Sequence, residues 1–436
     1  MEFQSKQKLQ FTVEAPGRKS RLDNYLWDKT DELALESAEI LHNPNKPLPE
    51  YGVLIPVAAH QESKRIYKSM SEYAQQEGVE DFVICLNLNY PFENSDSREV
   101  EATRQAVEQA IIDFGQLDIR YIELSYAEDE TTIGRIRKDL WDAVALLARA
   151  EGIYDQPDGE FIAINHDIDT ESIGKHYVRN IQRYYEREKS NLACSVYPDV
   201  ELEVRATQVK HAYPFETHPN IAKVILWQDF TFRQAARGGM YEEGMVIPIS
   251  SYAKAGGFLA DKSTYETHGL TDSAIKNGKI LGIAGTAMDT SARRYIARLD
   301  ETGSSSIWSD DTFGNNDSCR DSSLLPSDIS FERMEEIIFE DLDKNLVNVV
   351  DGITADEWNK LCVDYMLSGN MSDEELSSLV WNLIDPKLKL AKAVLARVSG
   401  SELLTSFVDR SVLTENVESI VASIKNRYNL SVFEKN

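Results

Sequence analysis

The stretch EFIAINHDIDT, residues 160–170, decides the fold of this 436-residue chain. Its first half, Glu160 to Asn165, is a short apolar run of the kind that forms a buried strand. The turn that follows carries Asp167 and Asp169, two carboxylates separated by one residue. At the carboxyl edge of a parallel sheet, where α/β proteins bind their ligands, such a pair can hold one Mg²⁺ or Mn²⁺ ion.

Strand-like and helix-like segments alternate ahead of this turn. Apolar runs predict strands at 51–57, 81–87, 118–124 and 160–165, and helical spacing predicts helices at 62–76, 99–114 and 134–150. Four strands that alternate with helices through short connections predict an α/β fold, with a mostly parallel sheet covered by helices.

The segments outside this alternation suggest the domain boundaries. Residues 1–50 are predicted to be an N-terminal extension with one helix at 23–42, and the α/β domain to cover 51–302. Beyond residue 190 the pattern predicts shorter strands, at 192–196, 222–230 and 245–249, and a helix around Tyr252. Residues 303–330 read as a polar loop, and 331–436 as a C-terminal helical region through which copies of the chain could associate.

Composition excludes several classes of protein. The formal net charge of −27 disfavours nucleic acid as a partner, and no run approaches the roughly 18 apolar residues of a membrane span. The start lacks the apolar core of a secretory signal, and four separated cysteines fit a reducing, cytoplasmic location. The motifs of P-loop nucleotidases, dinucleotide-binding dehydrogenases and serine hydrolases are absent from the sequence.

Motifs at 53–62, 133–139, 165–170, 252–258 and 290–294 follow one another in an order that resembles nucleotide-sugar glycosyltransferases of the GT-A fold, most closely family 2. The resemblance covers about residues 50–300. It implies a GT-A, Rossmann-like domain that moves a hexose from a nucleoside-diphosphate sugar, with Mn²⁺ or Mg²⁺ as cofactor, to a hydroxyl acceptor that is soluble or presented at a membrane surface.

The resemblance also implies roles for individual residues. Asp167 and Asp169 would hold the metal with His268 as a candidate third ligand, and Asp167 would also lie at the nucleotide. The other residues that it places near the nucleotide or its diphosphate are Pro56, Ala58, Glu62, Asn87, Arg135, Arg137, Lys138, Arg293 and Arg294. Asn87 departs from the family pattern, which has an aspartate at the end of the second strand.

The catalytic base is the second departure. The family places a Glu-Asp pair before a glycine, and counting back from Gly278 gives Glu266 followed by Thr267. Glu266 and Asp272 are therefore the candidates for the carboxylate that removes the acceptor proton in an inverting reaction. Two alternatives remain: a retaining enzyme similar to mannosylglycerate synthase, and a degenerate GT-A domain that only binds. Sugar-1-phosphate nucleotidyltransferases fit less well, because the loop after the first strand contains no glycine.

Overall fold

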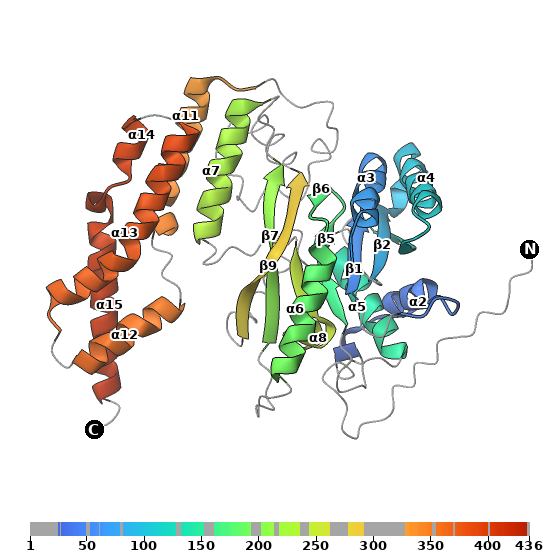
Figure 1. Cartoon of the computed structure of the whole chain (residues 1–436), viewed down its shortest axis with the longest axis horizontal. Helices are drawn as coiled ribbons and strands as arrows, with labels where there is room; N and C mark the ends of the chain where they lie inside the picture. The colour runs from blue at the N-terminus through green and yellow to red at the C-terminus, as the bar shows by residue number, and fades with distance from the viewer. Residues whose placement is uncertain are drawn as a thin grey trace, which may run out of the picture. The chain divides into compact units, whose positions relative to one another are not determined.

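The computed structural model describes residues 25–26, 28–48, 53–60, 62–78, 82–127, 132–151, 161–192, 202–212, 218–235, 244–261, 278–291, 328–350, 355–368, 371–399 and 402–433. They fall into two compact units (Figure 1). The first draws on Met1–Ala212 and Tyr241–Ser291, and the second on Tyr213–Met240 and Ser318–Asn436.

Unit 1 is built on a nine-stranded sheet in the order β3-β2-β1-β4-β8-β7-β9-β6, with β5 paired to β1 beside this path. The strands are β1 (Val53–Ala59), β2 (Phe82–Pro91), β3 (Asp118–Tyr126), β4 (Ile162–Ile164), β5 (His166–Asp167), β6 (Thr170–Ile173), β7 (Leu202–Ala212), β8 (Met245–Pro248) and β9 (Gly278–Ser291). Five of the eight strand pairings are parallel. The predicted α/β fold with a mostly parallel sheet is confirmed.

Helices lie on both faces of this sheet (Figure 1). They are α2 (Glu32–Leu41), α3 (Ser63–Ala74), α4 (Arg98–Asp113), α5 (Ile133–Ala150), α6 (Tyr177–Leu192) and the short α8 (Ile249–Ala255). Residues of α3, α4 and α6 share one apolar core with alternate residues of β1 and β2. Val53, Leu54 and Ile55 are all fully buried, as a strand covered on both faces requires.

The strand order reverses at β1, which is the feature that positions the site. The chain runs outward from β1 to β2 and β3, then returns through α5 to place β4 on the other side of β1. The helices on either side of such a reversal diverge and leave a crevice outside the carboxyl ends of the strands. Here the reversal falls between β1 and β4.

One expectation beyond residue 190 needs correction. The strand predicted at 222–230 is wrong, because these residues lie within helix α7 (Pro219–Ala235). The β-branched and aromatic side chains suggested a strand, yet Pro219 at the first helical position and burial at Ile221, Val224 and Ile225 are signs of a helix. Strand β7 was not predicted. Of the expected strand at 192–196, Leu192 ends α6 and the other residues lie outside the described ranges.

Every described element of unit 2 is a helix, and these elements include the C-terminal helices that the sequence predicts. Besides α7 it holds α11 (Phe331–Val350), α12 (Ala355–Ser368), α13 (Asp373–Val398), α14 (Glu402–Phe407) and α15 (Thr414–Phe433). Ile221, Val224 and Trp227 of α7 share its apolar core with residues of α11 and α13. The Trp227 indole also donates a 2.7 Å hydrogen bond to Asp341 of α11. A helix from the middle of the sequence therefore completes the core of the C-terminal region.

The start of α7 is capped from a distance. Asp328, which precedes α11, accepts hydrogen bonds from the backbone N–H groups of Asn220 at 3.1 Å and Ile221 at 3.2 Å. The Asn220 amide donates to the Ile329 carbonyl at 2.7 Å. Because a helix begins with unsatisfied N–H groups, this carboxylate serves as the N-cap of a helix that lies 108 residues earlier in the sequence.

We expect Asp328→Ala to destabilise unit 2 by about 1 kcal/mol, the usual cost of losing an N-cap side chain. Asp328→Asn should retain most of the stability, because an amide oxygen also accepts from the helix start. Chemical denaturation of both variants, followed by circular dichroism, measures the difference. Equal stability of the Ala and Asn variants would contradict the capping role.

Candidate functional site

The two aspartates of the 165–170 turn lie at the carboxyl edge of the sheet. Strand β5 pairs in parallel with the end of β1, so that Asp167 lies beside Ala58. The Asp167 carbonyl accepts a 2.9 Å hydrogen bond from the Thr170 hydroxyl, and the Asp169 carbonyl accepts one of 3.1 Å from the Ser291 N–H. Bonds on both sides hold this turn at the reversal of strand order, where the sequence analysis expected the ligand.

The residues that the resemblance places near the nucleotide surround this edge on β1 and β2. Pro56 and Ala58 lie on β1, and Asn87 lies next to Ala58 on β2. Asn87 is fully buried, and among the described residues its side-chain amide has no hydrogen bond of good geometry, although the hydroxyl of Tyr126 on β3 lies nearby. Glu62 precedes α3 and is paired with Arg65 of the same helix at 3.5 Å. A buried amide inside β2 that lacks a well-formed hydrogen bond suggests a functional reason for Asn87.

Arg137, on the first turns of α5, contacts the turn directly. Its guanidinium lies 2.5 Å from Asp167 Oδ1, and only 7% of the Arg137 side chain is exposed, against 20% for Asp167. An arginine in this position stays charged at any physiological pH, so it places a permanent positive charge at the edge of the sheet.

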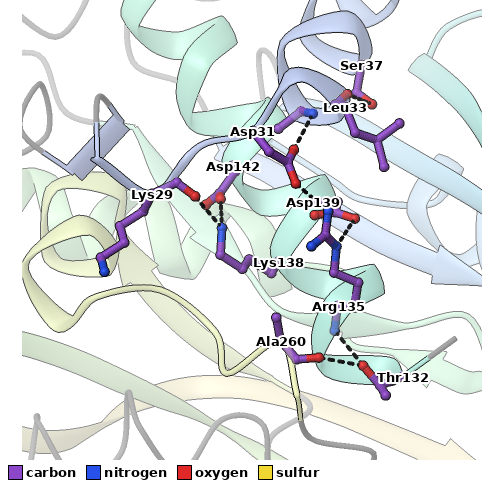
Figure 2. Close-up of polar contacts among 11 residues, drawn as sticks. Lys29, Asp31, Leu33, Ser37, Thr132, Arg135, Lys138, Asp139, Asp142 and Ala260 are labelled. Carbon is purple, nitrogen blue, oxygen red and sulfur yellow. Dashed lines mark hydrogen bonds and ion pairs between the residues drawn. The ribbon is translucent and has the colours of Figure 1, made fainter. Parts of the chain in front are cut away.

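The other two basic residues of the 133–139 motif point elsewhere. Arg135 donates to Asp139 at 2.8 Å and also to Asp31, the N-cap of α2 (Figure 2). Lys138 bonds Asp142 and the Lys29 carbonyl (Figure 2). Within the described part of the chain, Arg137 is thus the member of the trio that contacts Asp167.

Asp142 of α5 contacts side chains from two other segments of the chain. Its carboxylate is fully buried and accepts hydrogen bonds from the Tyr25 hydroxyl at 2.8 Å and the Tyr252 hydroxyl at 2.9 Å, besides its ion pair with Lys138. Burial raises the pKa of this carboxyl, while Lys138 and the two hydroxyls oppose that rise. The side chain ties the N-terminal segment, α5 and α8 together.

The segment after α8 is packed tightly against this cluster. Gly257 has a positive φ of 77°, and a Cβ there would come within 2.0 Å of the Tyr25 hydroxyl. Phe258 packs edge-on against Trp141 of α5 at 5.3 Å between ring centroids. The Ala260 carbonyl accepts a 2.6 Å hydrogen bond from Thr132, the N-cap of α5 (Figure 2). The 252–258 motif is therefore anchored on the same helix that contacts Asp167.

Five candidates lie outside the described residues: Glu266, Asp272, His268, Arg293 and Arg294. Among the described residues no three His, Cys, Asp or Glu side chains converge as a metal site would require. The side chains of Asp167 and Asp169 carry carboxylate oxygens, the kind of ligand that Mg²⁺ and Mn²⁺ prefer, and a full coordination shell would need further ligands.

Sequence reasoning missed Tyr25, Asp139 and Asp142. One signal was available for the acids: each follows a basic residue by four positions on an otherwise apolar helix, in the pairs Arg135–Asp139 and Lys138–Asp142. Nothing local connects Tyr25 to Asp142, because the two are 117 residues apart.

Comparison with known proteins gives structural similarities only. No family model matches the sequence, and no curated protein matches it. The fold is similar to residues 1–349 of S. aureus TarS, with 12% identity, 84% of this chain and 92% of that chain covered, and a TM-score of 0.35. It is likewise similar to TarS 1–349 in complex with UDP-GlcNAc, with 12% identity, 86% of this chain and 92% of that chain covered, and a TM-score of 0.36. A third similar structure is the mannosyltransferase PcManGT from Pyrobaculum calidifontis in complex with GDP-Man and Mn²⁺. Its identity is 14%, with 93% of this chain and 94% of that chain covered, and the TM-score is 0.37.

No described helix combines the length and the apolar composition that are needed to cross a membrane.

Gly257→Ala should destabilise unit 1 by about 1–3 kcal/mol, because it adds a side chain at positive φ and against Tyr25. Tyr25→Phe removes the hydroxyl that meets the new methyl group, but it also removes a hydrogen bond to Asp142. We therefore expect the double variant to be more stable than the sum of the two single losses predicts, as measured by urea denaturation in a double-mutant cycle. Strict additivity would show that the two residues do not touch.

Asp139 should make stability depend on pH. Burial raises its pKa to about 6, although Arg135 opposes the rise. Between pH 4 and 6 the folded chain keeps a proton that the unfolded chain releases, so this carboxyl stabilises the fold at acid pH and the benefit is lost as pH rises through 6. Asp139→Asn does not titrate. The unfolding free energy of the wild type relative to this variant should fall by about 2 kcal/mol from pH 4 to 7, as measured by denaturant titration.

Proposed function

We propose that this chain is a glycosyltransferase that takes a hexose from a nucleoside-diphosphate sugar, with Asp167 and Asp169 as ligands of Mn²⁺ or Mg²⁺. The observation that carries the proposal is the position of this pair, at the carboxyl edge of the sheet where the strand order reverses. The motif resemblance supports the reaction class, and Arg137 beside Asp167 supports an anionic ligand at the same place.

The residues of the chain would divide the work as follows. Asp167 and Asp169 would hold the cation, which supplies positive charge to the diphosphate leaving group. Arg137 would add a second positive charge from the side of α5. Ala58 near the end of β1 and its neighbour Asn87 on β2 would contact the nucleoside, to which the Asn87 amide offers both a donor and an acceptor.

Proton transfer would need a carboxylate at the acceptor. Glu266 and Asp272 remain the proposed candidates, with Glu266 first because of its spacing to Gly278. In an inverting reaction that carboxylate takes the proton from the acceptor hydroxyl as its oxygen attacks the anomeric carbon, and the nucleoside diphosphate leaves. The fold anchors the chain just before these residues, through Thr132 and Ala260.

Asp169→Asn should abolish Mn²⁺-dependent binding of nucleoside diphosphates, because an amide oxygen carries no charge and is a weaker ligand for a hard cation. Titration calorimetry with UDP and GDP, each with and without Mn²⁺, measures this on the full chain. Asp113→Asn on α4 is the matched control, since Asp113 lies on the surface and accepts a 3.2 Å hydrogen bond from the Tyr67 hydroxyl.

Unchanged Mn²⁺-dependent affinity in Asp169→Asn, with the folded state intact by circular dichroism, would mean that the metal site is misassigned. Tight donor binding without any turnover of UDP- or GDP-sugars, including hydrolysis, would favour the reading as a binding module.

A further inference from the structure

The ion pair between Arg137 and Asp167 places a cation at one of the two proposed metal ligands. The guanidinium lies 2.5 Å from Asp167 Oδ1, and 7% of the Arg137 side chain is exposed. A guanidinium so close to the carboxylate neutralises the charge that would attract a divalent ion. The pair is buried enough for water to screen it only partly.

The other basic groups of α5 cannot take this place without breaking their own pairs. Arg135 is held by Asp31 and Asp139, and Lys138 by Asp142 (Figure 2). Asp139 and Asp142 are themselves buried, so losing either partner would leave an uncompensated charge inside the protein. Of these three basic side chains, Arg137 is therefore the one that lies at the turn of Asp167 and Asp169.

We propose that Arg137 is a resident counter-cation that occupies the metal-binding carboxylate when no donor is bound and makes metal binding depend on the nucleoside diphosphate. This inference rests on the proposed function. With both aspartates ionised, Asp167, Asp169 and Arg137 sum to one negative charge, against two for the aspartates alone, so the guanidinium weakens the attraction of the turn for a divalent ion. A diphosphate brings further negative charge, which lets the guanidinium and the metal ion occupy the site together.

The coupling between metal binding and nucleotide binding follows from the charges of the three groups. Because a guanidinium and a divalent cation repel one another, removal of the guanidinium should favour the metal ion in the free protein. Removal of the guanidinium should also weaken the binding of the diphosphate, because the diphosphate loses a positively charged partner. Since binding linkage is reciprocal, the factor by which nucleoside diphosphate improves Mn²⁺ affinity should shrink together with the factor by which Mn²⁺ improves nucleotide affinity.

The test is Mn²⁺ binding to the full chain without nucleotide, measured from the electron paramagnetic resonance signal of free Mn²⁺. We expect Arg137→Met and Arg137→Gln to bind Mn²⁺ at least about ten times more tightly than the wild type, and Arg137→Lys to stay near the wild type because it keeps the charge. Arg104→Gln, which removes an equally ion-paired arginine on α4, is the control for net charge and should change nothing.

A second measurement adds UDP or GDP. In the wild type, nucleotide should raise Mn²⁺ affinity at least about tenfold, and in Arg137→Met and Arg137→Gln this gain should largely disappear. Circular dichroism identifies which variants are folded, and either neutral variant is sufficient for the test.

Three results would overturn the inference: no Mn²⁺ binding by any variant, unchanged or weaker Mn²⁺ affinity in the folded neutral variants, or equal tightening in Arg137→Lys. The proposed function fails separately. If the neutral variants bind Mn²⁺ more tightly but no form of the protein binds UDP or GDP with Mn²⁺, then Arg137 does occupy the cation site while the nucleotide-sugar donor is wrong.

Discussion

Helix α5 is buried along most of its length, yet its first ten residues include Arg135, Arg137, Lys138, Asp139 and Asp142. Charges inside a protein cost several kcal/mol each unless they are paired with good geometry. Each of these five is paired with another residue of α5, with the N-terminal segment, or with Asp167 in the turn after β4. The need to compensate the charges of α5 determines how the surrounding segments are arranged.

The two ends of the proposed site are linked through this helix. Arg137 contacts Asp167 at the carboxyl edge of the sheet, while Thr132 and Asp142 hold the segment from Tyr252 to Ala260. A change in the helix would therefore reach both sides. The N-terminal segment takes part as well, because Asp31 adds a second carboxylate partner for Arg135 and the Tyr25 hydroxyl donates a hydrogen bond to the buried Asp142 carboxylate. Its contribution to the fold of unit 1 goes beyond that of a simple extension.

The second unit shows a similar dependence on partners that are distant in sequence. Helix α7 is short of polar residues on the face that carries Ile221, Val224 and Trp227, and α11 and α13 cover that face. Asp328 caps its first turn, and Asp341 satisfies the Trp227 indole. A chain that ended near Leu325 would leave this apolar face and two hydrogen-bonding sites exposed. The C-terminal helices thus complete a core that begins inside the α/β portion of the sequence.

The sequence by itself determined the α/β class, the first four strands and the helices between them, and the position of Asp167 and Asp169 at the end of a strand. These features depend on local periodicity and on the order of elements, which a single sequence displays directly. It also indicated helices after residue 330. The tertiary structure decided which basic residue of α5 faces the turn of Asp167 and Asp169. Lys138 pairs locally with Asp142, whereas Arg135 pairs with Asp31, 104 residues away, and Arg137 with Asp167, 30 residues away. It likewise decided that 219–235 is a helix, since the partners that bury and cap it follow more than 100 residues later, and short-range patterns carry no information about them.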